Sequence, residues 1–557
     1  MEVLVVDHSS FRWVLRKIRH RIPSIMVLTF LQAANAFLGV MFALGSKAVI
    51  DGAISAEPAV FRAACIRQLL IVLGILLTVG LVRHLRERLA AQLERDWKKQ
   101  LLHGLLHGEY SKVAAYHSGD LLNRLNNDVT KVNDGVLNIF PAFAAMIVRL
   151  VAAVVILGVL DLRFALVAVS LGVIVVLVTG VLRRYMKQLH SKVSQMDGRV
   201  SGWIQESIEK LLMIQAMSVA PEVERRTEKL LDHRYEIQRK RKNISVAANT
   251  AVNIMAYGSG FLALLWCATG VMQGTMSFGS LTAIIQLVNQ LQRPFVDLSG
   301  VLPQYTAMLA SGERLMELDK IQGEPALISV PAEEMYREMD SICVENLTFS
   351  YDREKILSDV SFSLPKDAFA VVIGPSGTGK STLLKMLLGV YPPEKGDLFV
   401  QSTRGRYELN RSTRHLFAYV PQGNLLFSGT LRDNLTIVRP EATEAEIQQA
   451  VYASAMDSFL PQLPFGLDTD LGENGAGLSE GQAQRLAIAR AVLCGAPVLL
   501  LDECTSALDE QTEWTVLERL RQLPDRTCIT VSHRPAAITL CDWQLDLSDG
   551  NVTVMKQ

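Results

Sequence analysis

The sequence predicts a multidomain membrane protein, with a six-helix all-α transmembrane domain that has long cytoplasmic helices, followed by an α/β domain. Three observations predict this class. Among 557 residues, 49% are hydrophobic and 20% are charged, and the mean hydropathy is +0.23, which is unusual for a soluble enzyme of this size. Six long apolar windows all begin before residue 311, and strand patterns follow residue 340. The same composition excludes a disordered chain, a collagen-like fibre and a small disulfide scaffold.

Charge is divided unevenly along the chain, although the 56 basic and 56 acidic residues cancel. Residues 1–340 carry 37 basic and 29 acidic side chains, a net +8, and residues 341–557 carry 19 and 27, a net −8. The zero sum argues against a nucleic-acid-binding protein. The seven cysteines show no C-x-x-C spacing, so neither a metal site nor a disulfide framework is expected.

The membrane domain is predicted from windows of about 20 apolar residues, the length of helix that crosses a bilayer core. A buried helix of a soluble domain is the alternative, but such helices usually keep a polar stripe. The window 164–182 holds no charged residue at all. The six expected spans are 24–48, 66–85, 137–160, 164–182, 249–272 and 279–302.

The distribution of basic residues predicts the orientation of these spans, because Lys and Arg are retained on the cytoplasmic side. Arg83–Lys131 holds nine basic residues and Arg183–Lys242 holds fourteen, whereas the other connections hold few. We therefore expect both long connections and both termini to be cytoplasmic, in a multi-pass protein of a bacterial inner (plasma) membrane. Both connections keep helical periodicity and would carry the spans tens of Å below the bilayer.

Changes in composition mark the expected domain boundaries. Before the first span, Phe11–Ile22 mixes apolar residues with five basic ones, which is typical of an amphipathic helix on the inner membrane surface. After the sixth span, Ile321–Asp340 has two prolines, a glycine and an acidic cluster, as a linker does. The expected organisation is an amphipathic elbow segment at 1–23, a transmembrane domain at 24–320, a linker at 321–340 and an α/β domain at 341–557.

A phosphate-binding loop is predicted directly after a buried strand. The apolar run Phe369–Gly374 leads into GPSGTGKST and then a helical pattern, the context that the motif G-x-x-x-x-G-K-[ST] requires. Backbone N–H groups of such a loop close around phosphate oxygens. Lys380 would pair with the β- and γ-phosphates, and Ser381 would bind Mg²⁺. The nucleotide-binding residues expected in this loop are Gly374, Pro375, Ser376, Gly377, Thr378, Gly379, Lys380, Ser381 and Thr382.

An acidic pair follows a second buried strand. The segment Val498–Glu503 reads VLLLDE, and its four consecutive apolar residues put the carboxylates at a strand end rather than on a surface. Asp502 is placed to hold Mg²⁺, directly or through water, and Glu503 to orient and activate an attacking water. The two motifs together predict hydrolysis of a magnesium-bound nucleoside triphosphate.

A third motif lies between these two, where the polar loop and amphipathic helix of Leu478–Ala491 read LSEGQAQRLAIARA. With the three motifs in this order and spacing, the chain resembles an ATP-binding cassette (ABC) transporter, specifically an exporter-type half-transporter. The resemblance extends from the first span to about Asp549. It implies an α/β P-loop ATPase domain, with ATP and Mg²⁺ as its ligands, that drives movement of a substrate across the membrane.

The resemblance implies further roles position by position. Tyr351 matches the aromatic residue that stacks on adenine, and Gln422 matches the glutamine that touches Mg²⁺ and the attacking water. His533 matches the switch histidine that contacts the γ-phosphate. The expected catalytic residues are therefore Glu503, His533 and Gln422, and the expected magnesium ligands are Ser381, Gln422 and Asp502.

Other matches concern contacts between subunits or domains. Ser479, Gly481 and Gln482 match the signature, which in this family closes over the γ-phosphate of ATP held by the opposite subunit. This signature reads LSEGQ where the usual form is LSGGQ, so Glu480 places a carboxylate near phosphate, which disfavours closure although a working site is expected. The remaining matches are the D-loop at Ser506–Asp509, the loop that holds Glu473 and senses the transmembrane domain, and segments at and beside the two coupling helices, His117–Val129 and Glu206–Ala216.

The resemblance also implies a dimer, because one chain supplies six spans and one nucleotide domain where two of each are needed. The partner is either a second copy of this chain or a homologous half-transporter, and the complete motifs favour a homodimer. ATP held between two domains would favour the closed form, and hydrolysis would remove that preference. The alternative function is an ATP-gated channel or a regulatory membrane ATPase subunit without cargo pumping.

Polar residues within the spans indicate where a substrate could pass, because such groups usually face protein or a cavity. On the sixth span, spacing puts Gln286, Asn289, Gln290 and Arg293 on one helical face, for which hydrogen bonds between helices are the alternative. Arg149 in the third span forms either a buried ion pair or a substrate contact. A weaker polar pair in the fifth span consists of Asn249 and Asn253.

The expected cargo is an amphipathic or hydrophobic substrate that is exported by alternating access. A lipid, a drug-like small molecule and an unprocessed peptide all remain open. Self-processing peptide export is disfavoured, because only about 23 residues, and no peptidase domain, precede the first span.

Overall fold

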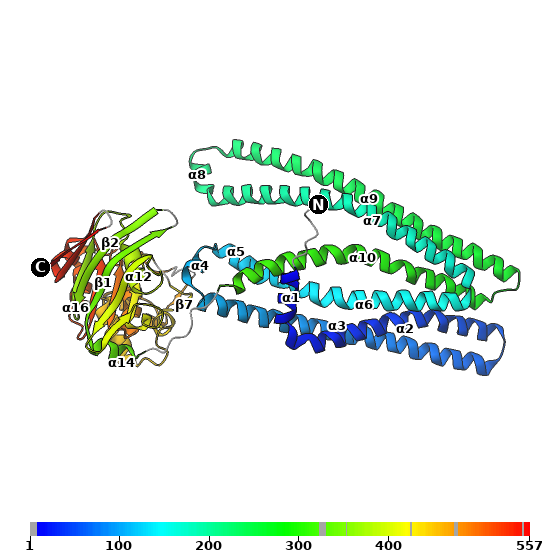
Figure 1. Ribbon diagram of the computed structural model, residues 1–557, viewed down its shortest axis with the longest axis horizontal. Coiled ribbons are helices and arrows are strands. Elements are labelled where there is room, and N and C mark those ends of the chain that lie inside the picture. The colour runs from blue at the N-terminus through cyan, green and yellow to red at the C-terminus, as the bar shows by residue number, and fades with distance from the viewer. Residues whose placement is uncertain are drawn as a thin grey trace. The chain divides into compact units, whose positions relative to one another are not determined.

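The computed structural model describes residues 8–321, 330–351, 354–423, 426–472, 477–548 and 551–556, without the side chains at some positions of three long helices. The chain divides into two compact units (Figure 1). The first unit comprises Met1–Gly104 and His117–Lys320, and the second comprises Leu105–Tyr116 and Ile321–Gln557. Each unit is described by itself.

The first unit is helical throughout its described residues. A short helix, α1 (His8–Lys17), precedes six long helices, and the short helices α5 (Ser118–Asn123) and α8 (Leu211–Ala216) lie between them. The long helices are α2 (Ile22–Ile54), α3 (Pro58–His107), α6 (Val129–Leu160), α7 (Leu162–Glu209), α9 (Ala220–Met272) and α10 (Phe278–Asp319). Each of the six predicted windows lies within one of these helices, which confirms the predicted helical membrane domain.

Four segments of the described chain are long and apolar enough to cross a membrane: Arg19–Ile54, Pro58–His107, Ser118–Leu160 and Asn253–Met272. The windows 164–182 and 279–302 lie on α7 and α10 and are not among these four. The helices α3, α7 and α9 contain 50, 48 and 53 residues. At 1.5 Å per residue, each is roughly 70 to 80 Å long, which is more than twice the thickness of a bilayer core.

Small side chains let the helices of the first unit approach closely. A cluster of buried residues that includes Val40, Leu157, Cys267 and Ile284 joins α2, α6, α9 and α10. Gly135 of α6 faces Met308 of α10 so closely that an added Cβ would lie 2.6 Å from its side chain. In contrast, Leu70, Leu76 and Leu77 of α3 are more than 60% exposed, as expected for a helix face in contact with lipid.

Polar contacts hold the ends of these helices together. Near the end of α2, Lys47 Nζ lies 2.9 Å from Asp51 Oδ2 and 2.9 Å from Ser280 Oγ of α10. Asp51 also accepts hydrogen bonds from the Ser277 hydroxyl and the Gly279 N–H, both at 3.0 Å. The carboxylate of Asp51 therefore joins the end of α2 to the beginning of α10.

The helix predicted within Phe11–Ile22 is present as α1 followed by a 3₁₀ turn at Arg19–Arg21. Its Trp13 Nε1 donates to Asp319 Oδ2 at 2.8 Å, and Lys17 Nζ lies 2.6 Å from Asp319 Oδ1. Arg21 Nη2 pairs with Asp96 of α3 at 2.7 Å. These contacts attach α1 to the last turn of α10 and to α3.

A buried carboxylate joins α6 and α10. Asp128 is fully buried and accepts hydrogen bonds from Ser311 Oγ at 2.9 Å and Arg314 Nε at 2.8 Å. Arg124, one turn earlier, bonds to Asp120 and Glu317. Removing one partner of a buried ion pair leaves the other charge uncompensated, which costs several kcal/mol.

The second unit contains two sheets. The larger has six strands in the order β12-β11-β3-β10-β9-β6, of which β11, β3, β10, β9 and β6 are parallel, and the smaller has four antiparallel strands in the order β2-β1-β4-β5. A two-residue pair, β7 (Gly429–Thr430) and β8 (Asp470–Leu471), forms a third sheet. The strands of the six-stranded and four-stranded sheets are β1 (Met339–Tyr351), β2 (Glu354–Pro365), β3 (Phe369–Ile373), β4 (Lys395–Ser402), β5 (Gly405–Glu408), β6 (Phe417–Val420), β9 (Val498–Asp502), β10 (Thr527–Val531), β11 (Trp543–Ser548) and β12 (Asn551–Lys556).

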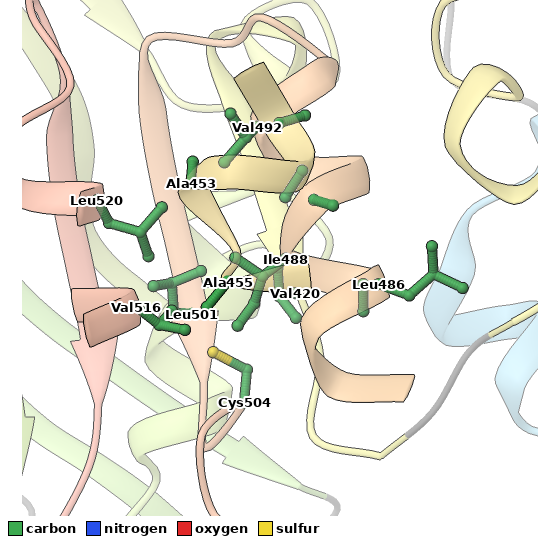
Figure 2. Packing of buried hydrophobic residues seen from close by; sticks show 14 of the residues in the cluster. Val420, Ala453, Ala455, Leu486, Ile488, Val492, Leu501, Cys504, Val516 and Leu520 are labelled. Carbon is green, nitrogen blue, oxygen red and sulfur yellow. The ribbon is translucent and has the colours of Figure 1, made fainter. Parts of the chain in front are cut away.

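Helices cover this α/β domain. They are α12 (Lys380–Leu387), α13 (Leu431–Thr436), α14 (Glu444–Ala453), α15 (Glu480–Leu493), α16 (Glu510–Arg521) and α17 (Pro535–Leu540). The same unit includes α4 (Tyr110–Ala114), which lies in the segment Leu105–Tyr116. Figure 2 shows Val516 and Leu520 of α16 beside Leu501 of β9, with Ile488 of α15 nearby in the same cluster. The predicted α/β domain is therefore confirmed. Within the segment expected as a linker, Ala332–Arg337 forms α11, whose Met335 and Tyr336 are buried.

We expect Asp128→Ala to lower the free energy of unfolding by about 3 kcal/mol, because Arg314 would lose its buried partner. The measurement is the melting temperature of the full chain in detergent. Asp134→Ala, on the exposed face of α6, is the matched control. Equal melting temperatures for the two variants would contradict a stabilising role for the Asp128 pair.

Candidate functional site

The parallel strands carry the predicted motifs to one edge of the six-stranded sheet. In the register of the sheet, Val372 pairs with Val531, Val531 with Asp502, and Leu501 with Val420. Because parallel strands end at the same edge, the loops that follow them lie side by side. These loops contain the phosphate loop after β3, His533 after β10, Glu503 after β9 and Gln422 after β6.

The phosphate loop has the backbone conformation that its glycines allow. Gly374 and Gly379 have φ values of 143° and 96°, which L side chains rarely adopt. A Cβ on Gly374 would lie 2.2 Å from the carbonyl oxygen of Leu547, and one on Gly379 would lie 2.6 Å from Ile356. Ser376 and Gly377 belong to the same turn, where Thr378 Oγ1 donates to the Pro375 carbonyl at 2.9 Å.

Lys380 is the first residue of α12 and is 94% buried, with its Nζ 2.8 Å from the carbonyl oxygens of both Gly374 and Pro375. Burial lowers the pKa of Lys380, while the carboxylates of Glu503 and Asp502 oppose this shift. The ammonium group therefore lies over the loop, next to the free N–H groups that begin α12. A cation and helix N-terminal N–H groups together suit a phosphate group.

Oxygen ligands for a cation gather at the end of β9. The Ser381 hydroxyl donates to Asp502 Oδ1 at 2.8 Å, and the Asp502 carboxylate is 99% buried. Hydroxyl and carboxylate oxygens are ligands that Mg²⁺ prefers. This pair of residues therefore fits the Mg²⁺ that an ATP site needs.

No sequence motif points to Tyr419 of β6, whose hydroxyl donates to Asp502 Oδ2 at 3.0 Å. Burial raises the pKa of Tyr419, and the Asp502 carboxylate adds to the shift, so the phenol stays protonated. One carboxylate oxygen of Asp502 thus accepts a hydrogen bond from Ser381, and the other accepts one from Tyr419. The sequence contains one indication of this role, because Tyr419 places a hydroxyl group near the end of the apolar strand that precedes Gln422.

Glu503 lies beside Gln422 in an unusual backbone conformation. Its φ is +48°, which is uncommon for a residue other than glycine, and its N–H donates to the Val531 carbonyl at 3.1 Å. Gln422 Nε2 donates to Glu503 Oε2 at 2.6 Å. His533 is exposed in the loop that follows β10 at the same edge. A carboxylate and an amide therefore lie together at the sheet edge that carries the phosphate loop.

Tyr351 ends β1 and is 39% exposed. Its hydroxyl lies 3.5 Å from Thr382 Oγ1, at the end of the phosphate-loop motif. The ring therefore lies at one border of the phosphate loop, as a residue that stacks on a base must.

The signature residues begin α15. Ser479 is its N-cap, and a reciprocal pair of hydrogen bonds joins its backbone and side chain to Gln482. Gly481 is close to the D-loop, since an added Cβ would lie 3.0 Å from the Ala507 carbonyl oxygen. Among the residues that the structure describes, no hydrogen bond or ring contact joins Ser479, Gly481 or Gln482 to the phosphate loop.

The segments expected to contact the other domain are only partly described. Glu473 lies outside the described residues. Of the predicted coupling segments, His117–Val129 contains α5 and a π-helical turn at Arg124–Asp128, and Glu206–Ala216 contains the end of α7 and α8.

The polar residues proposed for the spans have different surroundings. Gln290 Nε2 donates to the Gly39 carbonyl of α2 at 2.7 Å, which is a hydrogen bond between helices. Gln286 and Arg149 are half-buried, and Asn289 and Asn253 are exposed. The side chains of Arg293 and Asn249 lie outside the described residues.

Two family models match the chain. Residues 25–295 match the model described as ABC transporter transmembrane region. Residues 357–506 match the model described as ABC transporter. The two matches follow one another in a single chain.

Known proteins match over most of the chain. A probable ABC transporter ATP-binding/permease protein of Haemophilus influenzae is 29% identical over 80% of this chain and 80% of its own length. An ATP-dependent lipid A-core flippase of Desulfotalea psychrophila is 27% identical over 84% of this chain and 83% of its own. A structure of a bacterial Atm1-family ABC exporter with ATP bound has a TM-score of 0.79, at 24% identity, over 96% of this chain and 95% of that one, which shows a shared fold.

We expect Glu503→Gln to lower ATP hydrolysis at least ~100-fold, because an amide cannot accept the proton of the attacking water. Binding of a fluorescent ATP analogue should be kept, since Lys380 and the phosphate loop are unchanged. Glu518→Gln, an exposed glutamate on α16, is the control. Unchanged hydrolysis by Glu503→Gln would refute the assignment of Glu503 as the base.

Proposed function

The chain belongs to the ABC transporter family, as an exporter-type half-transporter that hydrolyses ATP, and from this premise we propose that two copies of it export an amphipathic or hydrophobic substrate. The observation that carries the proposal is the edge where Ser381, Asp502, Glu503 and Gln422 are linked in pairs by hydrogen bonds. Such an edge gives each chain one half of an ATP site, with groups that would hold the phosphates, Mg²⁺ and the attacking water.

In the proposed reaction, Lys380 pairs with the β- and γ-phosphates, and the glycine-rich turn donates N–H groups to them. Ser381, Asp502 and Gln422 would hold Mg²⁺, which when bound neutralises phosphate charge. Glu503 orients a water and accepts its proton as the water oxygen bonds to the γ-phosphorus. The bond from that phosphorus to the β-phosphate oxygen breaks, giving ADP and phosphate, while His533 donates a hydrogen bond to the γ-phosphate.

Two features support a second chain. The signature residues Ser479, Gly481 and Gln482 begin α15 and are exposed or half-buried, and we assign them to ATP held by the other chain. The tip of the α7–α9 pair also carries exposed apolar side chains, including Leu212 at 81%, Met217 at 66% and Ile208 at 66%. A large exposed apolar surface on a cytoplasmic tip suits a protein interface, and we assign it to the nucleotide domain of the second copy.

The proposed substrate path follows the face of α10 that carries Gln286 and Asn289. These polar side chains belong to α10, which also has buried apolar contacts with α2 and α6. The helix therefore combines polar and apolar groups. An amphipathic substrate, whether a lipid, a drug-like molecule or a peptide, matches such a surface. The hydrogen bond of Gln290 to Gly39 assigns that residue to helix packing instead.

Transport into sealed vesicles tests the proposal. The full chain is reconstituted with its nucleotide domain outside, and lipid, peptide and drug panels are added with ATP. A pump accumulates one of them above the outside concentration only with hydrolysable ATP, and Glu503→Gln abolishes the accumulation. Equilibration without accumulation would support a gated channel, and ATP hydrolysis without any cargo movement would support a regulatory ATPase.

Glu480 should weaken closure of the proposed dimer on ATP. It is exposed at the first turn of α15, next to the Ser479 and Gly481 backbone that would meet the γ-phosphate. Two negative charges about 4 Å apart in water repel by about 1 kcal/mol, so Glu480→Gly should lower the KM for ATP about five-fold. Glu480→Asp, which keeps the charge, is the control and should leave KM near its wild-type value. A KM for Glu480→Gly equal to that of Glu480→Asp would contradict the repulsion.

A further inference from the structure

A short segment between two membrane-domain helices belongs to the compact unit of the nucleotide domain. Leu105–Tyr116 contains the last three residues of α3, the short helix α4 and the turn before α5, yet it clusters with Ile321–Gln557. Arg411 Nη1 donates to the carbonyl of His107 at 3.0 Å, which fixes one end of the segment. The segment is therefore attached to the nucleotide domain by a hydrogen bond as well as by packing.

An aromatic cluster connects this segment to the proposed adenine site. Tyr110, at the start of α4, meets Tyr391 edge to face, with ring centroids 6.1 Å apart and planes at 78°. Tyr391 in turn meets Tyr351 at 5.5 Å and 90°, and Phe349 at 5.6 Å. Tyr391 is thus in contact with the ring proposed to stack on adenine and with the ring of the segment.

The geometry of these ring contacts means that a shift of one ring changes its contact with the next. Edge-to-face aromatic pairs are directional, because the positive edge of one ring must lie over the negative face of the other. The rings of Phe349 and Tyr351 are also perpendicular, with centroids 5.0 Å apart, so Tyr351 has a directional contact on a second ring of the cluster. Burial raises the pKa of Tyr391 to about 12, and its neighbour Tyr351 adds to the shift, so the phenol stays neutral within the cluster.

We propose that Tyr391 is a positioning residue through which a base stacked on Tyr351 orders the segment Leu105–Tyr116 by way of Tyr110. The inference rests on the assignment of Tyr351 to adenine in the proposed function. It requires that a nucleotide with a base orders the segment more than a triphosphate without one, because the aromatic cluster is engaged by the base and not by phosphate.

Hydrogen exchange of residues 105–116 in the full chain, reconstituted in lipid nanodiscs, tests this inference. The probes are the magnesium complexes of a non-hydrolysable ATP analogue and of inorganic tripolyphosphate. For the wild type, the ATP analogue should slow exchange of the segment about five-fold, and tripolyphosphate should have little effect. Tyr391→Leu should lose the effect of the analogue, whereas Tyr391→Phe, which keeps the ring, should retain it.

Tyr407→Leu is the matched control, because Tyr407 is another half-buried tyrosine that packs on the same core cluster as Tyr391. It should behave as the wild type. Since Tyr391→Leu can impair folding, Tyr110→Leu provides the reciprocal variant, and Tyr110 is 52% exposed. This variant should keep binding of a fluorescent ATP analogue and lose the nucleotide effect on exchange near residue 110.

The outcomes separate the two proposals. If the wild type does not bind the fluorescent analogue, the proposed nucleotide site itself fails. If it binds, but Tyr391→Leu and Tyr110→Leu both show the full wild-type slowing of exchange, the inference about Tyr391 is overturned. Equal slowing by tripolyphosphate and by the ATP analogue would overturn it as well.

Discussion

The parallel register of β3, β10, β9 and β6 is the constraint on which the site depends. Each strand ends at the same edge, so the phosphate loop, Glu503 and Gln422 meet although they lie far apart in the sequence. The strands are buried on both faces, which explains their continuous apolar sequences. A shift of one strand would separate Ser381 from Asp502, and these two residues are 121 positions apart in the chain.

This edge also explains why the site holds strained and buried polar groups. Asp502 is buried, but Ser381 and Tyr419 satisfy both of its oxygens, which offsets the cost of burying a charge. Glu503 keeps its left-handed backbone because the adjacent strand accepts its N–H. Strain held in this way by the surrounding sheet is typical of catalytic positions. Through Tyr391, Tyr351 of the proposed nucleotide site is connected to Tyr110 of Leu105–Tyr116.

Local patterns allowed much of this to be predicted from the sequence. The phosphate loop and the acidic strand are continuous motifs, and apolar windows located the six long helices. Tyr391 and Tyr419 could not be found in this way, because their roles depend on partners far away in the sequence, Tyr110 for Tyr391 and Asp502 for Tyr419. The helix α11 was hidden in a segment whose prolines and charges are typical of a linker, although Met335 and Tyr336 are buried. The opposite charges of the two halves follow from basic helix extensions and an acidic nucleotide domain.

We propose that each ATP site is shared between two copies of the chain, and mixing two inactive variants tests this most directly. Lys380→Ala removes the phosphate lysine, and Ser479→Arg blocks the signature, so neither variant alone should hydrolyse ATP. In a mixed dimer, the intact phosphate loop of one chain faces the intact signature of the other. The account predicts that co-expression restores part of the hydrolysis. No recovery in mixed dimers that are shown to form would contradict a shared site.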